Sequence, residues 1–160
     1  MRKNMKKILS MVAVMLLSAA SLMAQNPDKG LSFAVETGIG SEWELGARAQ
    51  YNFNKYVAWD VLNLKYALDY NDGGNWNEFT IQTGVRAFSP TFGPDMKAFA
   101  ALDLGYGNMW KHGNTSCFAL DFTVGLYLYK GLYAGYGFGG LFNDGSHKDH
   151  LLRIGYNFTF

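Results

Sequence analysis

Hydrophobic and polar residues alternate with a period of two along most of the chain. In the clearest stretch, from Trp43 to Phe53, apolar side chains share one face while polar residues or glycine share the other. Alternation of this kind predicts a β-strand with one apolar face. Eight such segments are found, at residues 31–39, 43–53, 57–70, 78–87, 97–107, 117–128, 132–139 and 152–160.

The third segment changes phase in its middle. Its apolar residues occupy odd positions up to Val61 and even positions from Leu62 onward. Without an extra residue at this point, Asn63 and Lys65 would project among the apolar side chains. We therefore expect a β-bulge near Val61 and Leu62.

The connections alternate between tight turns and longer polar loops. Tight turns are expected at 52–55, 89–95 and 130–131, and Gly/Asn-rich loops at 40–42, 71–77, 111–116 and 143–149. Eight segments joined in this way predict an antiparallel up-and-down meander. Closure into a barrel would remove its two edges. The predicted fold class is therefore all-β, an eight-stranded antiparallel up-and-down barrel.

The first 24 residues follow a different pattern. A basic start with four Lys and Arg residues precedes an apolar stretch and then a run of mostly small residues. This order is typical of a secretory signal peptide, which is removed on export. The expected division of the chain is a signal peptide at 1–24, a short periplasmic segment at 25–30 and the barrel at 31–160.

Composition excludes several other classes of protein. After the leader no stretch of about 18 apolar residues occurs, which excludes a helical membrane protein. Four of the 14 Lys and Arg residues lie in the leader, which leaves 10 basic against 13 acidic residues. That balance does not suit a nucleic-acid-binding protein. Cys117 is the single cysteine, so a disulfide scaffold is excluded, and we expect Cys117 to be a small inward-facing filler.

Alternation alone leaves open which face of the barrel is outside. A soluble lipocalin-like barrel would enclose a ligand with its apolar face, whereas a transmembrane barrel would turn that face toward lipid. The polar face is rich in glycine, which suits the crowded interior of a small barrel. Aromatic residues also gather near the segment ends, as interfacial girdles require. Both features favour a transmembrane β-barrel.

The last segment carries the motif Tyr156-x-Phe158-x-Phe160. It resembles the carboxy-terminal signature of Gram-negative outer-membrane proteins, which their assembly machinery reads. With the leader and eight segments, the chain resembles the small outer-membrane β-barrels of the OmpX and OmpA membrane-domain type, sometimes labelled porin-like. Unlike the OmpA type it has no domain after the barrel, so peptidoglycan anchoring is not expected. Its loops are short compared with OmpX-like proteins, so a protruding adhesive sheet is not expected either.

The resemblance implies a location and a set of partners. We expect export to the outer membrane of the cell envelope, contact with outer-membrane lipid and lipopolysaccharide, and delivery by periplasmic chaperones and the barrel-assembly machinery. The protein is expected to be a monomer with both termini in the periplasm. An envelope structural or surface-interaction role is expected, with no enzymatic activity and no cofactor.

With the apolar face outward, acids and bases are both predicted to face inward. Eight-stranded barrels have an interior only wide enough for side chains to fill, so we expect a salt-bridged plug assisted by Phe99, Tyr127 and Tyr133. Glu36, Arg48, Asp121 and Arg153 are expected near one level. A narrow porin-like channel for small solutes is the alternative. The predicted network is Glu36, Glu44, Arg48, Asp60, Lys65, Glu78, Arg86, Lys97, Asp103, Asp121 and Arg153.

Candidate chemistry is confined to the loops. A second alternative is a lipid A-modifying enzyme, for which the last two polar loops would supply hydroxyl, imidazole and carboxylate groups. No fixed spacing identifies them as a set, so no catalytic residues are assigned. No metal site is assigned to His147 and His150 either, because residues three apart on a strand point to opposite faces. The loop residues concerned are His112, Ser116, Ser146, His147, Asp149 and His150.

Overall fold

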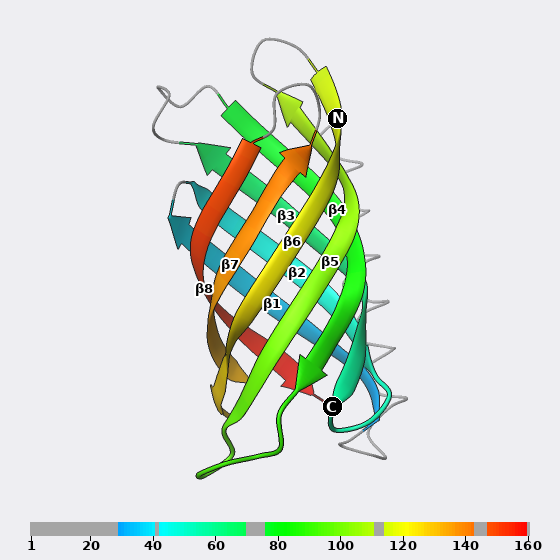
Figure 1. Cartoon of the computed structure of the whole chain (residues 1–160), viewed down its shortest axis with the longest axis vertical. Coiled ribbons are helices and arrows are strands. Elements are labelled where there is room, and N and C mark those ends of the chain that lie inside the picture. The colour runs from blue at the N-terminus through cyan, green and yellow to red at the C-terminus, as the bar shows by residue number, and fades with distance from the viewer. Residues whose placement is uncertain (1–28, 41, 70–75, 111–113, 143–146, 160) are drawn as a thin grey trace, which may run out of the picture.

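The computed structural model describes residues 29–40, 42–69, 76–110, 114–142 and 147–159, which form a closed barrel of antiparallel strands (Figure 1). Each strand pairs with its neighbours in sequence, and the last pairs with the first, from Ser32 opposite Thr159 to Gly40 opposite Leu151. The predicted fold is confirmed. The strands are β1 (Gly30–Gly40), β2 (Trp43–Asn52), β3 (Val57–Asp69), β4 (Trp76–Phe88), β5 (Lys97–Trp110), β6 (Asn114–Tyr129), β7 (Leu132–Phe142) and β8 (His147–Thr159).

The two ends of the barrel differ. The ends of β1 and β8 near Gly30 and Thr159 lie together with the connections at 53–56, 89–96 and 130–131, and we call this the turn end. We call the opposite end, where β1 is followed by β2 and β7 by β8, the loop end. At the turn end a vestibule of about 360 Å³ opens between the strand ends.

Three strands begin earlier at the loop end than the sequence predicts. β4 starts at Trp76, β6 at Asn114 and β8 at His147, so the loops predicted at 71–77, 111–116 and 143–149 were drawn too long. The hydrogen-bonded ladder continues there, with Gly140 opposite Lys148. Hydrophobic alternation stops before the ladder does, because outward-facing positions such as Lys148 are polar at this end.

The predicted β-bulge is confirmed. The β2–β3 ladder passes over Val61, because Ala49 lies opposite Leu62 while Gln50 lies opposite Asp60. The β3–β4 register shifts at the same place. The extra residue turns inward two polar side chains that would otherwise face outward, Asn63 and Lys65.

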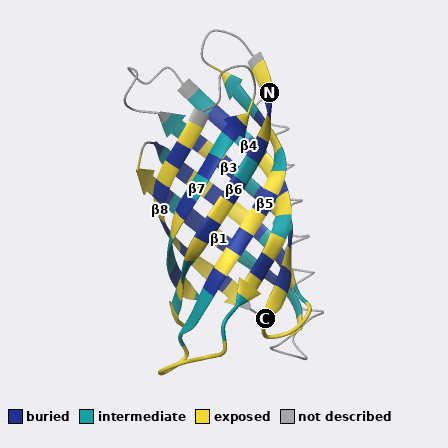
Figure 2. Cartoon of the chain, viewed as in Figure 1, coloured by how far each residue is buried: buried dark blue, intermediate teal, exposed yellow. Residues whose placement is uncertain are grey.

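Buried and exposed residues alternate along the strands (Figure 2). The large exposed residues are apolar, and most of the buried residues are polar or charged. Leu152 is 66% exposed and Val85 58%, whereas Asp60 and Arg153 are buried. A soluble barrel with an apolar, ligand-binding interior is therefore excluded. No helix in the described part of the chain is long and apolar enough to span a bilayer.

Interior glycines make room for large polar side chains. A Cβ atom added at Gly137 would lie 2.5 Å from Nη1 of Arg153, and one added at Gly155 would collide with the ring of Tyr133. These close approaches confirm the expectation that the glycine-rich face forms the crowded interior of the barrel, where the glycines make room for Tyr133 and Arg153.

Along β6 the interior is layered. Cys117 and Ala119 pack with Leu141 near the loop end, which confirms that Cys117 is an inward filler. Asp121 follows in the middle, and Tyr127 packs with the aromatic cluster of Phe99 and Tyr133 near the turn end. The charged middle of the barrel is therefore bracketed by apolar side chains on both sides.

Candidate functional site

Charged side chains fill the middle of the barrel. Ten of the eleven predicted network residues are buried, and they come from every strand except β7. Lys97 is half-buried instead and lines the vestibule at the turn end. The buried ten are Glu36, Glu44, Arg48, Asp60, Lys65, Glu78, Arg86, Asp103, Asp121 and Arg153.

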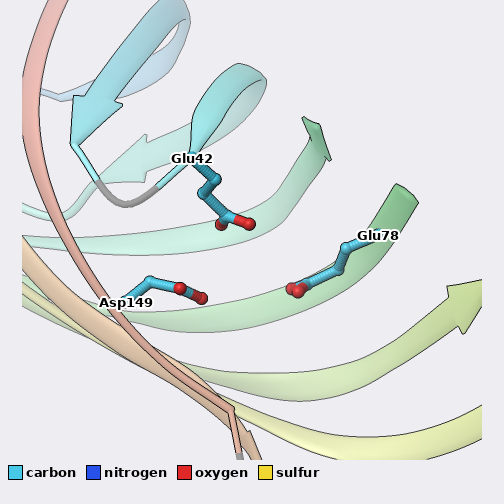
Figure 3. Close-up of side chains that lie close together, drawn as sticks. All are labelled: Glu42, Glu78 and Asp149. Atoms are coloured by element: carbon cyan, nitrogen blue, oxygen red, sulfur yellow. The ribbon is translucent and has the colours of Figure 1, made fainter. Parts of the chain in front are cut away.

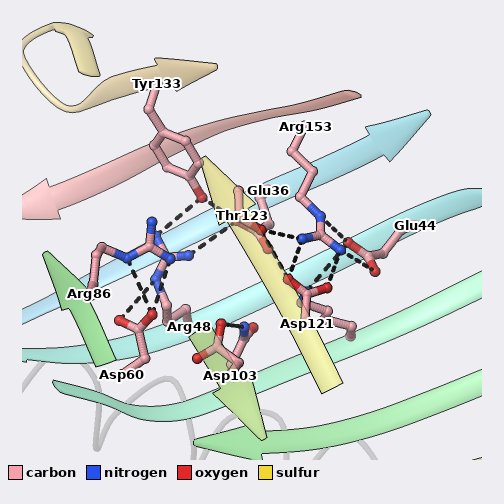
Figure 4. Close-up of polar contacts among 12 residues, drawn as sticks. Glu36, Glu44, Arg48, Asp60, Arg86, Asp103, Asp121, Thr123, Tyr133 and Arg153 are labelled. Atoms are coloured by element: carbon pink, nitrogen blue, oxygen red, sulfur yellow. Dashed lines mark hydrogen bonds and ion pairs between the residues drawn. The ribbon is translucent and has the colours of Figure 1, made fainter. Parts of the chain in front are cut away.

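One group of charges is centred on Arg153 of β8 (Figure 4). Its Nε donates to Oε1 of Glu44 at 2.9 Å, and its Nη2 donates to Oδ2 of Asp121 at 2.6 Å. Lys65 donates to the same Asp121 oxygen at 2.8 Å. Two cations and two carboxylates from β2, β3, β6 and β8 thus meet across the lumen.

A second group lies toward the turn end and is centred on Arg48 of β2 (Figure 4). Arg48 donates to Oε2 of Glu36 at 3.2 Å, and its Nε lies 3.6 Å from Oδ1 of Asp60. Arg86 donates to Oδ2 of Asp60 at 3.1 Å. The hydroxyl of Tyr133 donates to Glu36, which ties this group to the aromatic cluster.

The structure therefore divides the four residues that the sequence places near one level. Glu36 is paired with Arg48 in one group, and Asp121 is paired with Arg153 in the other. Glu44, rather than Glu36, is the second acid on Arg153. Asp103 belongs to neither ion-pair group and accepts a hydrogen bond from Nδ2 of Asn63 at 3.2 Å.

The arrangement is suited to holding a lumen shut. Taking an ion out of water costs several kcal/mol, and only close pairing with good hydrogen bonds offsets that cost. Each guanidinium in the network contacts a carboxylate on another strand. Arg153 of β8 also links two strands that are distant in sequence, β2 through Glu44 and β6 through Asp121. Beside the Arg153 group, a cavity of only about 20 Å³ remains.

Three buried acids lie together at the loop end, and of these only Glu78 was predicted from the sequence to face inward. Glu42, Glu78 and Asp149 each direct a carboxylate toward the others, with one oxygen from each within 4.8 Å of the other two (Figure 3). Glu42 and Asp149 were assigned to loops. Leu151 and Arg153 occupy inner-face positions, and extending this alternation back by one step places Asp149 on the inner face as well. The inward position of Asp149 could therefore have been predicted from the sequence.

Two of the described loop residues considered for chemistry, Asp149 and His150, lie on opposite sides of the barrel wall. Asp149 is buried inside, whereas His150 lies on the outer surface, where its Nδ1 is 2.6 Å from the hydroxyl of Tyr136. An aspartate and a histidine on opposite sides of the wall cannot act on one substrate atom. Ser146 and His112 lie outside the described residues, as do the predicted signal peptide and the side chain of His147.

Two residues of the predicted assembly signature are described. Tyr156 and Phe158 both face outward, with ring centroids 4.9 Å apart in an edge-to-face arrangement. Phe160 lies outside the described residues. The visible part of the motif is thus an aromatic pair on the outer surface at the turn end.

Comparison with known proteins identifies structures of the same fold. Neisserial surface protein A is 14% identical, with a TM-score of 0.59 over 81% of this chain and 94% of that one. The N-terminal β-barrel domain of OprF from Pseudomonas aeruginosa is 15% identical, with a TM-score of 0.54 over 82% and 98%. No family model and no curated protein matches the sequence. The likeness shows a shared fold, that of small eight-stranded outer-membrane barrels, and leaves the activity to be argued from the site.

Proposed function

We propose that this chain is an integral outer-membrane protein whose lumen is closed by its own ion pairs and which serves the envelope as a structural or surface-interaction element. The leader at residues 1–24 directs its export, and the chaperones and assembly machinery of the periplasm deliver it as a monomer. Contact with lipid and lipopolysaccharide follows from the apolar outer face. No catalytic set and no cofactor enters this proposal.

The observation that carries the proposal is the buried network across the lumen. Arg153 and Lys65 join Asp121 to Glu44, and Arg48 with Arg86 joins Glu36 to Asp60. A solute crossing the barrel would have to separate these pairs and leave buried charges uncompensated, at about 3–5 kcal/mol for each broken pair. The vestibule at the turn end does not give a solute a way around the ion pairs. The aromatic cluster of Phe99, Tyr127 and Tyr133 lies between the vestibule and those pairs.

Conductance across a planar lipid bilayer tests the closed lumen. The purified mature protein is expected to insert without steady conductance. The double variant Glu44→Gln/Asp121→Asn, which removes both acids from Arg153, is expected to conduct intermittently. Steady conductance of the wild-type barrel would contradict the proposal and establish the narrow-channel alternative.

Membrane fractionation tests the location separately. The protein is expected to sediment with the outer membrane and to migrate faster on gels unheated than boiled, because a closed strand ladder resists detergent until heated. Recovery of the folded barrel in the soluble periplasmic fraction would contradict the membrane assignment.

A further inference from the structure

A cation-binding geometry exists at the loop end, outside the ion-pair network. Glu42 follows β1, Glu78 lies in β4 and Asp149 in β8, so three separate elements supply the three acids. Figure 3 shows the three carboxylates converging from these elements. We propose that Glu42, Glu78 and Asp149 form a Ca²⁺ site that closes the loop end of the barrel.

Burial of unpartnered oxygens is the second observation for a ligand here. Glu42 is 2% exposed and Glu78 8%, yet Oε2 of each has no hydrogen-bond partner among the described residues. The hydroxyl of Thr80 is also buried without a partner, and it lines the same cavity as the three acids. Buried polar atoms are nearly always satisfied, so these oxygens call for a ligand that accepts their lone pairs.

Two cations lie close to these acids. Lys65 and Arg153 line the same cavity, but their close ion pairs are with Asp121 and Glu44. Glu42 is crowded instead by other acids. Its carboxylate lies close to those of Asp149 and Glu78, and like charges so near one another repel. A bound divalent cation would remove that repulsion.

The dimensions select Ca²⁺. Calcium takes oxygen ligands at about 2.3–2.6 Å, so two oxygens on one ion lie at most about 5 Å apart. The three carboxylate oxygens satisfy that limit, since they lie within 4.8 Å of one another. Mg²⁺ keeps several of its waters. The cavity of about 20 Å³ has room for one ion or one water but not for a hydrated one.

Titration of the chelator-treated mature protein, refolded in detergent, with CaCl₂ tests the site. Wild-type protein is expected to bind one Ca²⁺ per chain by isothermal calorimetry. Its thermal unfolding midpoint is expected to rise in Ca²⁺ and not in NaCl of equal ionic strength. Glu42→Gln and Glu78→Gln should each weaken binding at least tenfold, while the matched turn-end variant Asp95→Asn should leave it unchanged.

Three results would overturn the proposal. The first is the absence of both saturable binding and a Ca²⁺-specific midpoint shift in the wild-type barrel, a result that does not depend on any variant folding. The second is undiminished binding by a Glu42→Gln/Glu78→Gln protein whose heat-dependent gel mobility shows that it is folded. The third is equal weakening by Asp95→Asn, which would assign the bound ion to the general negative charge of the protein.

Discussion

Arg153 and Glu44 lie opposite the same residue, Gly38, on the two sides of β1. The guanidinium reaches across β1 to the carboxylate and binds it through Nε at 2.9 Å and Nη2 at 3.2 Å. Gly38 lacks a side chain that could separate them. The contact therefore links β8 to β2 at the place where the barrel closes, and it does so through side chains in addition to the backbone ladder.

Removing the Arg153 charge is expected to destabilise the barrel strongly. In Arg153→Met, Glu44 remains buried without its guanidinium partner, and Asp121 keeps only Lys65. Breaking a buried pair from one side costs about 3–5 kcal/mol. Arg153→Lys should recover part of this loss, since it restores the charge but not the two-pronged contact. Urea unfolding in lipid vesicles measures both, and a loss below about 1 kcal/mol for Arg153→Met would contradict the structural importance of the pair.

Replacing Asp121 is expected to lower the free energy of unfolding at least as much as placing a charge on the lipid-facing surface of the barrel does. Asp121→Ala deprives both Lys65 and Arg153 of a partner, and Glu36 cannot replace it because Glu36 is bound to Arg48 and Tyr133. The expected loss is about 3–5 kcal/mol.

The outward neighbour Phe122 provides the comparison. Phe122→Arg at the centre of β6 should cost about 2–4 kcal/mol if the residue lies near the bilayer midplane. Phe122→Ala separates the penalty of the charge from the loss of the ring. Unfolding titrations in vesicles rank the variants. An Asp121→Ala protein with wild-type stability would mean that Glu44 alone neutralises both cations.

The period-two pattern was sufficient to predict the strands, the bulge and the polar interior, because a slip by one residue would reverse the inner and outer faces. The pattern could not predict which acid forms an ion pair with which base. Glu36 of β1 lies opposite Gly155 of β8, two residues from Arg153, yet the acid that Arg153 binds is Glu44 of β2. That choice depends on register between strands and on side-chain reach across the lumen. The buried role of Glu42 was not predicted either, because Glu42 was assigned to a loop, although it extends the inner-face positions of Glu44 and Gly46 back by one step.

Gly137 is expected to be required for the position of Arg153. A Cβ atom there would lie 2.5 Å from Nη1 and 2.6 Å from Cζ of the guanidinium, whose other contacts prevent it from moving freely. Gly137→Ala should therefore cost about 1–3 kcal/mol, as overpacking typically does. In an Arg153→Lys background the same substitution should cost less, because the planar group is gone. A double-mutant cycle on vesicle-unfolding free energies measures the coupling, and strict additivity would show that the two positions do not interact.

Deleting Phe160 is expected to separate folding from assembly. The described ladder between β1 and β8 extends to Thr159, so every described pair of that ladder remains in the deletion variant. The alternation of the last segment predicts that the Phe160 side chain faces outward, and its loss should forfeit at most about 1.5–3 kcal/mol of burial. Refolding into detergent or vesicles should therefore stay nearly intact.

In cells the same deletion should deplete the protein from the outer membrane, if Tyr156-x-Phe158-x-Phe160 is read by the assembly machinery. The control is the substitution Phe142→Ala, which removes an outward aromatic side chain at the loop end. It should leave the amount of the protein in the outer membrane close to that of the wild type. Immunoblots of outer-membrane fractions provide the comparison with refolding yields. Normal membrane levels of the Phe160 deletion would remove the terminal residue as an assembly signal, and the outer-membrane proposal would then rest on the leader, the lipid-facing wall and the fold.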